Sequence, residues 1–260
     1  MVKISDRFST NWIKRVEMRS LYNKKHILHW AYLDYLGTDK AIKNSIKNTI
    51  SGSNTKLKAL DVGCGPNQVH RIVFENYGYE YFGIDITGSG PIIQWDGNTI
   101  PVADASMDYV LISWTLQNIT NQISLISEVH RVLVKKGKVF IVNTVLSPVS
   151  LSNSKNAIQS SLEKGRLQPE GMRQALVSGF ENIEMEHKGG IGQTLGWNLH
   201  IIWWKFYRNT NRIIRIASWV GFPLFILLTL VINLTGIFYN LFDSSGRYSS
   251  YFVVEAQKSD

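Results

Sequence analysis

The segment Leu60-Asp61-Val62-Gly63-Cys64-Gly65-Pro66-Asn67 decides the fold prediction. A short apolar strand runs directly into two glycines, which let the backbone turn sharply and approach a ligand closely. The helix expected after this turn would offer free N–H groups at its start. Asp85 lies about twenty residues further on, at the end of the next expected strand, where a carboxylate can accept hydrogen bonds from both hydroxyls of a ribose. A glycine turn alone is a weak signal, and Asp85 makes it more specific.

Strand and helix patterns alternate along the chain on both sides of this segment. Such alternation is typical of an α/β fold, in which a mainly parallel sheet is covered by helices on both faces. The expected helices are 69–77, 119–134 and 169–178, and residues 135–137 (Lys-Lys-Gly) suit the C-terminus of the second one. The apolar side of that helix is expected to consist of Ile123, Ile126, Val129 and Leu133. The expected strands are 57–62, 81–86, 109–113, 139–145, 182–187 and 251–256.

The first 50 residues are predicted to be helical and are strongly basic. Ile42, Ile46 and Ile50 recur at helical spacing, with Thr38 or Asp39 as the N-cap. Residues 1–59 hold twelve Lys or Arg and four Asp or Glu, and the rest of the chain is balanced. This region could attract nucleic acid, anionic lipid or an acidic substrate, or simply be a solvated helical face.

The cysteine content and the first residues indicate the cellular compartment in which the protein is expected. The single cysteine, Cys64, allows neither an internal disulfide nor a cysteine-based metal site, which suits a reducing cytoplasm. Residues 1–16 hold no apolar run of the kind found in a signal peptide. His, Cys, Asp and Glu show no ligand spacing, so we expect no metal.

Four motifs in order resemble the class I S-adenosylmethionine-dependent methyltransferases (type 11-like). Asp61-x-Gly63-x-Gly65 followed by Tyr81-Phe82-Gly83-Ile84-Asp85 resembles the first two motifs of this family. Residues 95–101 and 104–109 resemble the stretch before its fourth strand, and residues 128–133 with 136–138 its helix and turn before the fifth. The resemblance covers about residues 56–146. It implies a Rossmann-like, mainly parallel seven-stranded sheet with 251–256 as the last strand.

The resemblance also implies S-adenosylmethionine as the cofactor and a role for each matching residue. Gly63 and Gly65 would let the backbone meet the methionine part, and Asp61 would support that loop or receive the amino group. Asp85 would bind the ribose, and Asp96 with the Gly97 backbone would bind the adenine amino group. The same resemblance places Cys64, Ile86 and Trp114 in the cofactor site.

Two positions depart from the family pattern. Asn67 stands where a third glycine is frequent, and Asn tolerates left-handed backbone conformations. A frequent histidine after the fourth strand is replaced within Leu116-Gln117-Asn118-Ile119, so no catalytic base is named. His70, His187 and His200 are available without motif support, and His130 is expected to be structural. Residues 114–118 and 143–154 follow strand ends, where they should border the acceptor pocket.

A basic and apolar insertion separates the last two expected strands. Residues 189–242 contain Lys205, Arg208, Arg212 and Arg215 and no acidic residue. Residues 216–242 form a run of 27 without a charged side chain, longer than the roughly 20 that span a bilayer. Aromatic and basic residues beside such a run suggest a membrane interface carrying anionic lipid, with a buried core or a dimer interface as alternatives.

The insertion interrupts the expected methyltransferase domain. It also suggests which class of acceptor the protein methylates. We expect a basic helical region at 1–55, a methyltransferase domain at 56–188 with 247–260, and a membrane-associating insertion at 189–246. A methyltransferase with such an insertion looks like those of bacterial surface-glycan assembly, whose acceptors are lipid-linked. A quinone precursor is a second acceptor class.

The last two strands constrain the membrane topology. In the resembling family they are antiparallel neighbours, so the insertion should return to the side it left, with Gly221 and Pro223 breaking the run. We therefore expect a peripheral, monotopic or re-entrant protein on the cytoplasmic side of a membrane. An RNA methyltransferase, or a scaffold without activity, remains the alternative; partnership with nucleic acid is disfavoured because RNA-reading aromatic modules are lacking. The acceptor and the oligomeric state stay open.

Overall fold

The computed structural model describes residues 27–28, 32–49, 56–88, 90–144, 167–190, 194–195, 198–199, 202–203, 206, 211–240 and 249–260. The chain forms two compact units, which we describe separately. One comprises residues 40–188 and 251–260, and the other comprises residues 1–39 and 189–250. The predicted helical residues before 27, Ile50, His200, Lys205, Arg208 and residues 145–154 lie outside the described part.

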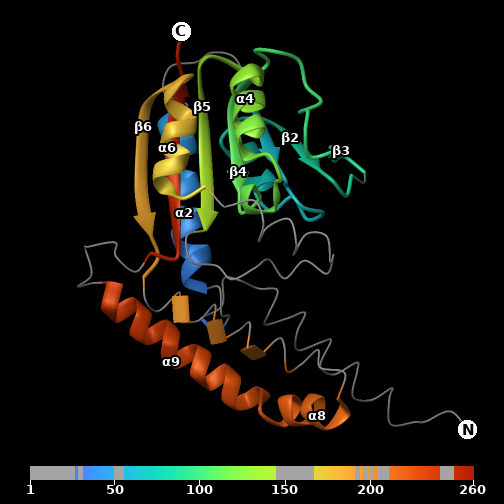
Figure 1. Ribbon diagram of the computed structural model, residues 1–260, viewed down its shortest axis with the longest axis vertical. Helices are drawn as coiled ribbons and strands as arrows, with labels where there is room; N and C mark the ends of the chain where they lie inside the picture. Colours follow the sequence, from blue (N-terminus) through green and yellow to red (C-terminus); the bar gives the residue numbers. More distant parts are fainter. Residues whose placement is uncertain are drawn as a thin grey trace, which may run out of the picture. The chain divides into compact units, whose positions relative to one another are not determined.

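The larger unit is built on one seven-stranded sheet in the order β3-β2-β1-β4-β5-β7-β6 (Figure 1). Five strands from β3 to β5 run parallel, and β7 is antiparallel to both β5 and β6. The fold class predicted from the sequence is therefore confirmed. The strands are β1 (Lys58–Val62), β2 (Glu80–Asp85), β3 (Ile93–Gln94), β4 (Met107–Ser113), β5 (Leu133–Thr144), β6 (Phe180–Lys188) and β7 (Tyr251–Lys258).

Helices cover both faces of the sheet, as Figure 1 shows. Alternate side chains of β1, β4, β5 and β7 point to opposite sides, so the sheet has two apolar layers. The first layer packs against α4 (Gln122–Val132) and α6 (Pro169–Val177). The second packs against the later part of α2 (Tyr32–Thr49), through Ile42 and Ile46, and against α3 (Arg71–Asn76), through Phe74. The short helix η2 (Leu116–Asn118) follows β4.

Several expected boundaries were wrong. Helix α2 begins at Tyr32, so neither Thr38 nor Asp39 is its N-cap, and the Thr38 hydroxyl is buried without a hydrogen bond. Helix α4 ends at Val132 rather than near Gly137, because Leu133 is already extended and pairs with Met107 of β4. The residues between Leu133 and Lys138 form an irregularity inside β5, where Lys136 takes a φ of +62°.

The apolar side of α4 also differs from the expectation. Ile126 and Val129 are buried, whereas Ile123 is 62% exposed. Strand β3 was missed because two residues are too short to show a pattern.

The pairing of β6 with β7 fixes where the insertion is attached. Lys188 is the register partner of Tyr251, and Tyr251 also pairs with Thr144 at the end of β5. Because β5 and β6 both run antiparallel to β7, these three residues lie at the carboxyl edge of the sheet. The chain therefore leaves and re-enters the sheet at two adjacent positions of this edge.

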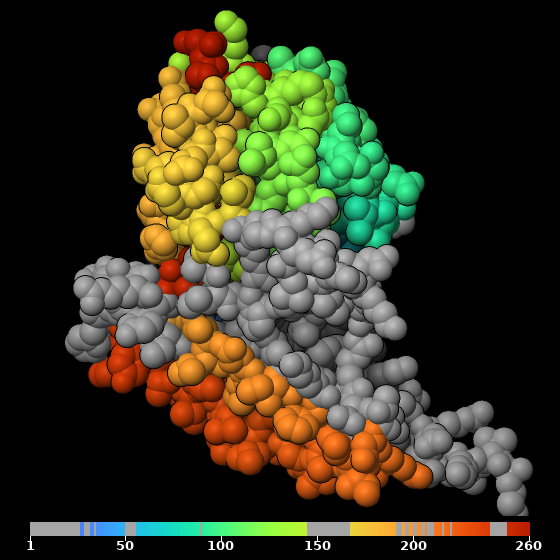
Figure 2. Space-filling view, viewed as in Figure 1, coloured from blue at the N-terminus to red at the C-terminus, as the bar shows by residue number. Residues whose placement is uncertain are grey.

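The smaller unit contains two helices joined at Gly221. They are α8 (Arg212–Val220) and α9 (Phe222–Asn240), whose side chains form a continuous orange-red surface in Figure 2. Trp203 packs on the junction, and its ring stacks on Phe225 with centroids 4.8 Å apart. Within the described residues, α9 alone is long and apolar enough to cross a membrane, judged by length and composition. A soluble core helix can pass this test, but it would be mostly buried, and only 22% of the window Phe222–Tyr239 is.

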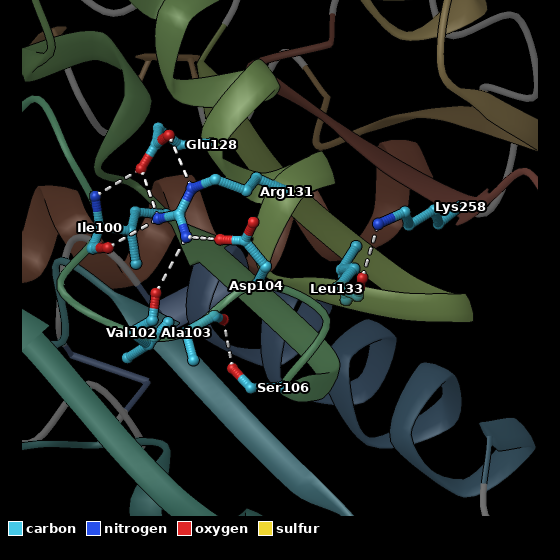
Figure 3. Close-up of polar contacts among 9 residues, drawn as sticks. All are labelled: Ile100, Val102, Ala103, Asp104, Ser106, Glu128, Arg131, Leu133 and Lys258. Carbon is cyan, nitrogen blue, oxygen red and sulfur yellow. Dashed lines mark hydrogen bonds and ion pairs between the residues drawn. The ribbon is translucent and has the colours of Figure 1, made fainter.

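Arg131 on α4 anchors the segment between β3 and β4 (Figure 3). Its guanidinium donates to both carboxylate oxygens of Glu128, at 2.9 and 2.7 Å, and to Asp104 at 2.5 Å. It also donates to the backbone carbonyls of Ile100 (2.8 Å) and Val102 (3.0 Å). Glu128 in turn accepts the Ile100 N–H at 2.8 Å. We call these residues the Arg131 clamp, and it fixes residues 100–104, just before β4.

We expect Arg131→Met to lower the free energy of unfolding by about 2–3 kcal/mol, because the half-buried Glu128 carboxylate and two carbonyls lose a charged donor. Urea denaturation measures this loss. Arg71→Met is the matched control, since Arg71 makes a single exposed ion pair with Glu75 (2.7 Å) and its loss should cost less than about 0.5 kcal/mol. Equal losses in the two variants would show that the clamp is not a stabilising element.

Candidate functional site

The glycine turn after β1 has the geometry of a ligand-binding loop. Gly63 and Gly65 have φ angles of +74° and +65°, which L side chains rarely adopt. The N–H groups of Gly63 and Cys64 both donate to the Ile84 carbonyl on β2. A Cβ on Gly63 would lie 2.2 Å from the Thr115 hydroxyl, so this glycine is required by packing. A Cβ on Gly65 would meet nothing within 4 Å, so open space lies before it.

Asp85 ends β2 and is joined directly to this turn. Its Oδ2 accepts the Gly65 N–H at 3.0 Å, and its Oδ1 accepts the Thr87 N–H (2.9 Å) and hydroxyl (2.7 Å). Burial opposes ionisation, but these three hydrogen bonds together hold the pKa of the Asp85 carboxyl below its ordinary value. A carboxylate has about four acceptor positions, so Asp85 can still accept a ligand donor.

Asp61 is buried beneath the turn. Its Oδ2 accepts the Tyr81 hydroxyl at 2.9 Å. Burial raises the pKa of the Asp61 carboxyl, although nearby His70 and the bond from Tyr81 favour the ionised form. This geometry agrees with a supporting role for the loop. Tyr81 was not foreseen as part of the site.

Cys64 points its side chain away from the open space. Its Sγ lies 2.8 Å from the position of a Cβ on Gly83, so the thiol packs against β2 and only its backbone can reach a ligand. Burial, together with the charges of Asp61 and Asp85, raises the pKa of the Cys64 thiol to about 12. The thiol is therefore protonated and unreactive at neutral pH.

Asp96 and Gly97 follow β3 at the same edge of the sheet. The Trp95 N–H donates to the Asp85 carbonyl at 2.9 Å, which places this segment beside the end of β2. Asp96 accepts the Asn98 N–H at 2.8 Å, and this bond holds the pKa of the Asp96 carboxyl below its ordinary value. Gly97 has a φ of +87° and open space before its Cα. Ile86, next to Asp85, is 65% exposed and presents an apolar surface at this edge.

The ends of β4 and β5 hold polar groups without partners. Trp114 has a φ of +56°, donates its N–H to the Val142 carbonyl and packs its ring on Tyr251. Among the described residues, three buried groups here find no hydrogen-bond partner: the Ser113 hydroxyl, the Gln117 carbonyl oxygen and both amide atoms of Asn143. Unpaired buried polar atoms are costly, so these atoms are candidates for contact with a ligand.

The histidines supply no evident base. His187 is exposed near the end of β6, and His70 precedes α3. His130 packs edge-to-face on Phe180, with centroids 5.4 Å apart, as a structural residue would. Gln68, not Asn67, takes the left-handed conformation after the turn. Within the described ranges, no three His, Cys, Asp or Glu side chains are placed to hold a metal ion, and the expectation of no metal stays a prediction.

The predicted cofactor site is thus brought together at one edge of the sheet. A hydrogen bond joins Gly65 to Asp85, and a second one joins Asp85 to the residue before Asp96. Two glycines with open space flank the Asp85 carboxylate, which fits a nucleoside cofactor whose ribose needs an acceptor and whose other parts need close backbone approach. The Cys64 side chain is the exception.

We expect Asp61→Asn to change the pH dependence of stability. The pKa of Asp61 is higher in the folded than in the unfolded chain, where it is about 4, so wild-type stability falls as pH rises above about 4. Asparagine keeps the shape and can still accept from Tyr81, so the variant lacks this fall. Urea unfolding from pH 4 to 7 should show that the free energy of unfolding of the variant, relative to that of the wild type, increases as pH rises. A constant difference would contradict a raised pKa.

Known proteins share this fold. Structures of phosphoethanolamine N-methyltransferase 2 from Haemonchus contortus align over 85% and 94% of this chain, at 17% and 16% identity and TM-scores of 0.51 and 0.53. One was crystallised with phosphomonomethylethanolamine and S-adenosylhomocysteine and the other with S-adenosylmethionine. The present chain spans only 53% and 59% of their length. A Galdieria sulphuraria protein assigned as a sarcosine dimethylglycine methyltransferase aligns over 87% of this chain and 84% of its own, with 16% identity and a TM-score of 0.53.

Sequence comparison identifies the domain itself. No curated protein matches the chain. The family model of a methyltransferase domain matches residues 60–141, which run from β1 to β5 and include the glycine turn, Asp85, Asp96 and the Arg131 clamp. Residues 60–141 therefore match a methyltransferase domain, and the sheet that contains them has the class I, Rossmann-like methyltransferase fold.

Proposed function

We propose that the protein transfers a methyl group from S-adenosylmethionine to an amphipathic or lipid-linked small molecule at a membrane surface. The observation that carries the first half is the hydrogen bond from Gly65 to Asp85, which sets a left-handed glycine beside an ionised carboxylate. The cofactor supplies a methyl group already activated by its sulfonium. The protein then has to bind the cofactor, orient the acceptor and exclude water.

Each residue of the site has a task in this proposal. Asp85, ionised because of its three hydrogen bonds, accepts from the ribose hydroxyls. Gly63 and Gly65 admit the methionine part, while Asp61 supports their loop from beneath. Asp96, held by the Asn98 N–H, and Gly97 receive the adenine.

The acceptor is proposed to bind over the ends of β4 and β5. Asn143 and Gln117 carry buried, neutral polar atoms without partners, and they lie on β5 and on η2, which contacts β5. Neutral amides suit an uncharged group that both donates and accepts, such as a hydroxyl, better than a phosphate or an ammonium ion. A hydroxyl of a surface-glycan intermediate has this chemistry. No base is assigned for its proton.

The membrane half of the proposal is supported by the insertion. Both ends of residues 189–250 are attached at the carboxyl edge, next to Thr144 and therefore next to the proposed acceptor pocket. The insertion exposes a long apolar helix and carries Lys or Arg but no acidic residue over 189–242. Such a segment is attracted to anionic lipid headgroups, as on the cytoplasmic face of a membrane. A lipid-linked acceptor could then reach the site without leaving the bilayer.

We expect Asp85→Ala to weaken S-adenosylmethionine binding by about 1.5–3 kcal/mol, the scale of hydrogen bonds to a charged group. Isothermal titration calorimetry measures the affinity. Glu80→Gln is the control, because Glu80 lies on the same strand at its opposite end, is exposed and should leave the affinity unchanged. Unchanged binding in Asp85→Ala would remove Asp85 from the site.

Methyl transfer itself can be tested with S-adenosylmethionine labelled in the methyl group. Purified protein is incubated with lipid extract, RNA or protein from the source cells, and the label in each fraction is counted. We expect label in the lipid fraction only, and Asp85→Ala should reduce it. Label in RNA would support the RNA methyltransferase alternative, and cofactor binding without transfer to any fraction would support a scaffold.

A further inference from the structure

Helix α9 buries Thr229 and Asn233 and exposes most of its apolar side chains, together with Thr235. Phe225, Thr229, Asn233 and Gly236 are buried along one side of the helix. Asn233 is only 2% exposed, and its Nδ2 donates to the Ile27 carbonyl at 2.5 Å. The opposite side carries exposed Leu224, Leu227, Leu228, Val231, Leu234, Ile237 and Phe238.

The same inversion appears in α8. Ser218 is buried, whereas Ile213, Ile216 and Val220 are exposed at positions that share one helix face. A water-soluble helix has the reverse arrangement, with its apolar stripe toward the core. A surface with apolar side chains outward and polar groups turned inward suits a solvent of acyl chains.

The lengths of α9 and of the segment after it limit how α9 can be oriented in a bilayer. As a helix of 19 residues it is about 28 Å long, close to the roughly 30 Å of a hydrocarbon core. Ten residues, 241–250, separate its end from Tyr251, which pairs with Lys188 on the sheet. If α9 crossed the bilayer, the chain would have to cross a second time to pair β7 with β6. Before α9, the longest stretch of residues 189–221 without Lys or Arg is 16 residues, fewer than the roughly 20 that span a bilayer. After α9, these ten residues would have to cross back. As a helix they would reach about 15 Å, and as an extended chain they would carry unpaired backbone through lipid.

We infer that α8 and α9 lie in the plane of the membrane within one leaflet, with Leu224, Val231 and Phe238 toward the acyl chains and Thr229 and Asn233 toward the protein. Charge favours lipid over a protein partner as the occupant of this face. Arg212 is exposed at the start of α8, and residues 189–242 contain no acidic residue. This inference deepens the membrane association proposed above but does not depend on methyl transfer.

Depth-dependent quenching tests the inference. Leu224, Val231 and Phe238 are seven residues apart on nearly the same face and are 59%, 48% and 59% exposed. Each is replaced in turn by cysteine in the full-length protein and labelled with bimane. The native Cys64 is buried and its thiol pKa is about 12, so it stays unlabelled, which the wild type verifies. Vesicles of phosphatidylcholine and phosphatidylglycerol carry spin labels at shallow or deep positions of the acyl chain.

We expect all three labels to be quenched and to report the same depth. A transmembrane helix would instead change depth by about 10 Å per step, and this gradient would overturn the inference. A label at Val177→Cys should not be quenched, because Val177 is 64% exposed at the end of α6, at the sheet edge opposite the insertion. The absence of quenching at all three positions would also overturn it, and sedimentation without vesicles would then show whether a second copy covers the face.

The introduction of a charge provides a second measurement. Leu227→Glu should weaken sedimentation with these vesicles by about tenfold or more, because a carboxylate would enter the acyl region. Ile123→Glu, an equally exposed apolar position on α4, should leave it unchanged. Cofactor affinity, measured by calorimetry, should be unaltered in both. A loss of vesicle binding with normal cofactor binding separates this inference from the proposed chemistry.

Discussion

The position of β7 between β5 and β6 is the constraint on which the other features depend. Its antiparallel pairing closes the sheet with a strand that arrives from the far end of the insertion. The register brings Thr144, Tyr251 and Lys188 into one row at the carboxyl edge. One row of backbone hydrogen bonds therefore determines that the insertion starts and finishes beside the strand ends that form the site. It also forbids a single crossing of a membrane, because the strand would be separated from its sheet.

Two kinds of polar group stand out in the larger unit. Asp85 at the carboxyl edge is held ionised by three donors, and the Arg131 clamp beside the start of β4 uses all three nitrogens of its guanidinium. In contrast, buried polar atoms of Asn143 on β5 and of Gln117 on η2 have no hydrogen-bond partner among the described residues. The bonds to Asp85 hold the strand end at which we propose that the cofactor binds. The unpaired atoms lie where we propose that the acceptor binds, and any partner for them would have to come from outside the described residues.

The sequence predicted the sheet well, and also that Gly65, Asp85 and Asp96 lie at one edge of it, because both depend on local patterns. Apolar runs ending in Gly63-x-Gly65 or in Asp85 mark strand ends, and the strands between β1 and β5 each appear as such a run except β3. Boundaries were missed where tertiary pairing decides them. Leu133 fits a helix by its spacing but pairs with Met107, and Thr38 resembles a cap but lies inside α2. The side-chain direction of Cys64 could not be predicted, since it depends on the gap left by Gly83, nineteen residues further along the chain.

The insertion shows most clearly what a sequence pattern leaves undecided. A run of 27 residues without charge indicates an apolar solvent or a buried core, and composition cannot distinguish a crossing from an in-plane helix. Two features of the structure favour the in-plane arrangement that we infer. Thr229 and Asn233 point inward while leucines point outward, so the two sides of the helix differ in chemistry. A membrane-crossing helix without neighbours would present lipid to all sides and have no reason to bury an asparagine against a backbone carbonyl. The second feature is the return of the chain to β7, which an in-plane helix permits without separating the strand from its sheet.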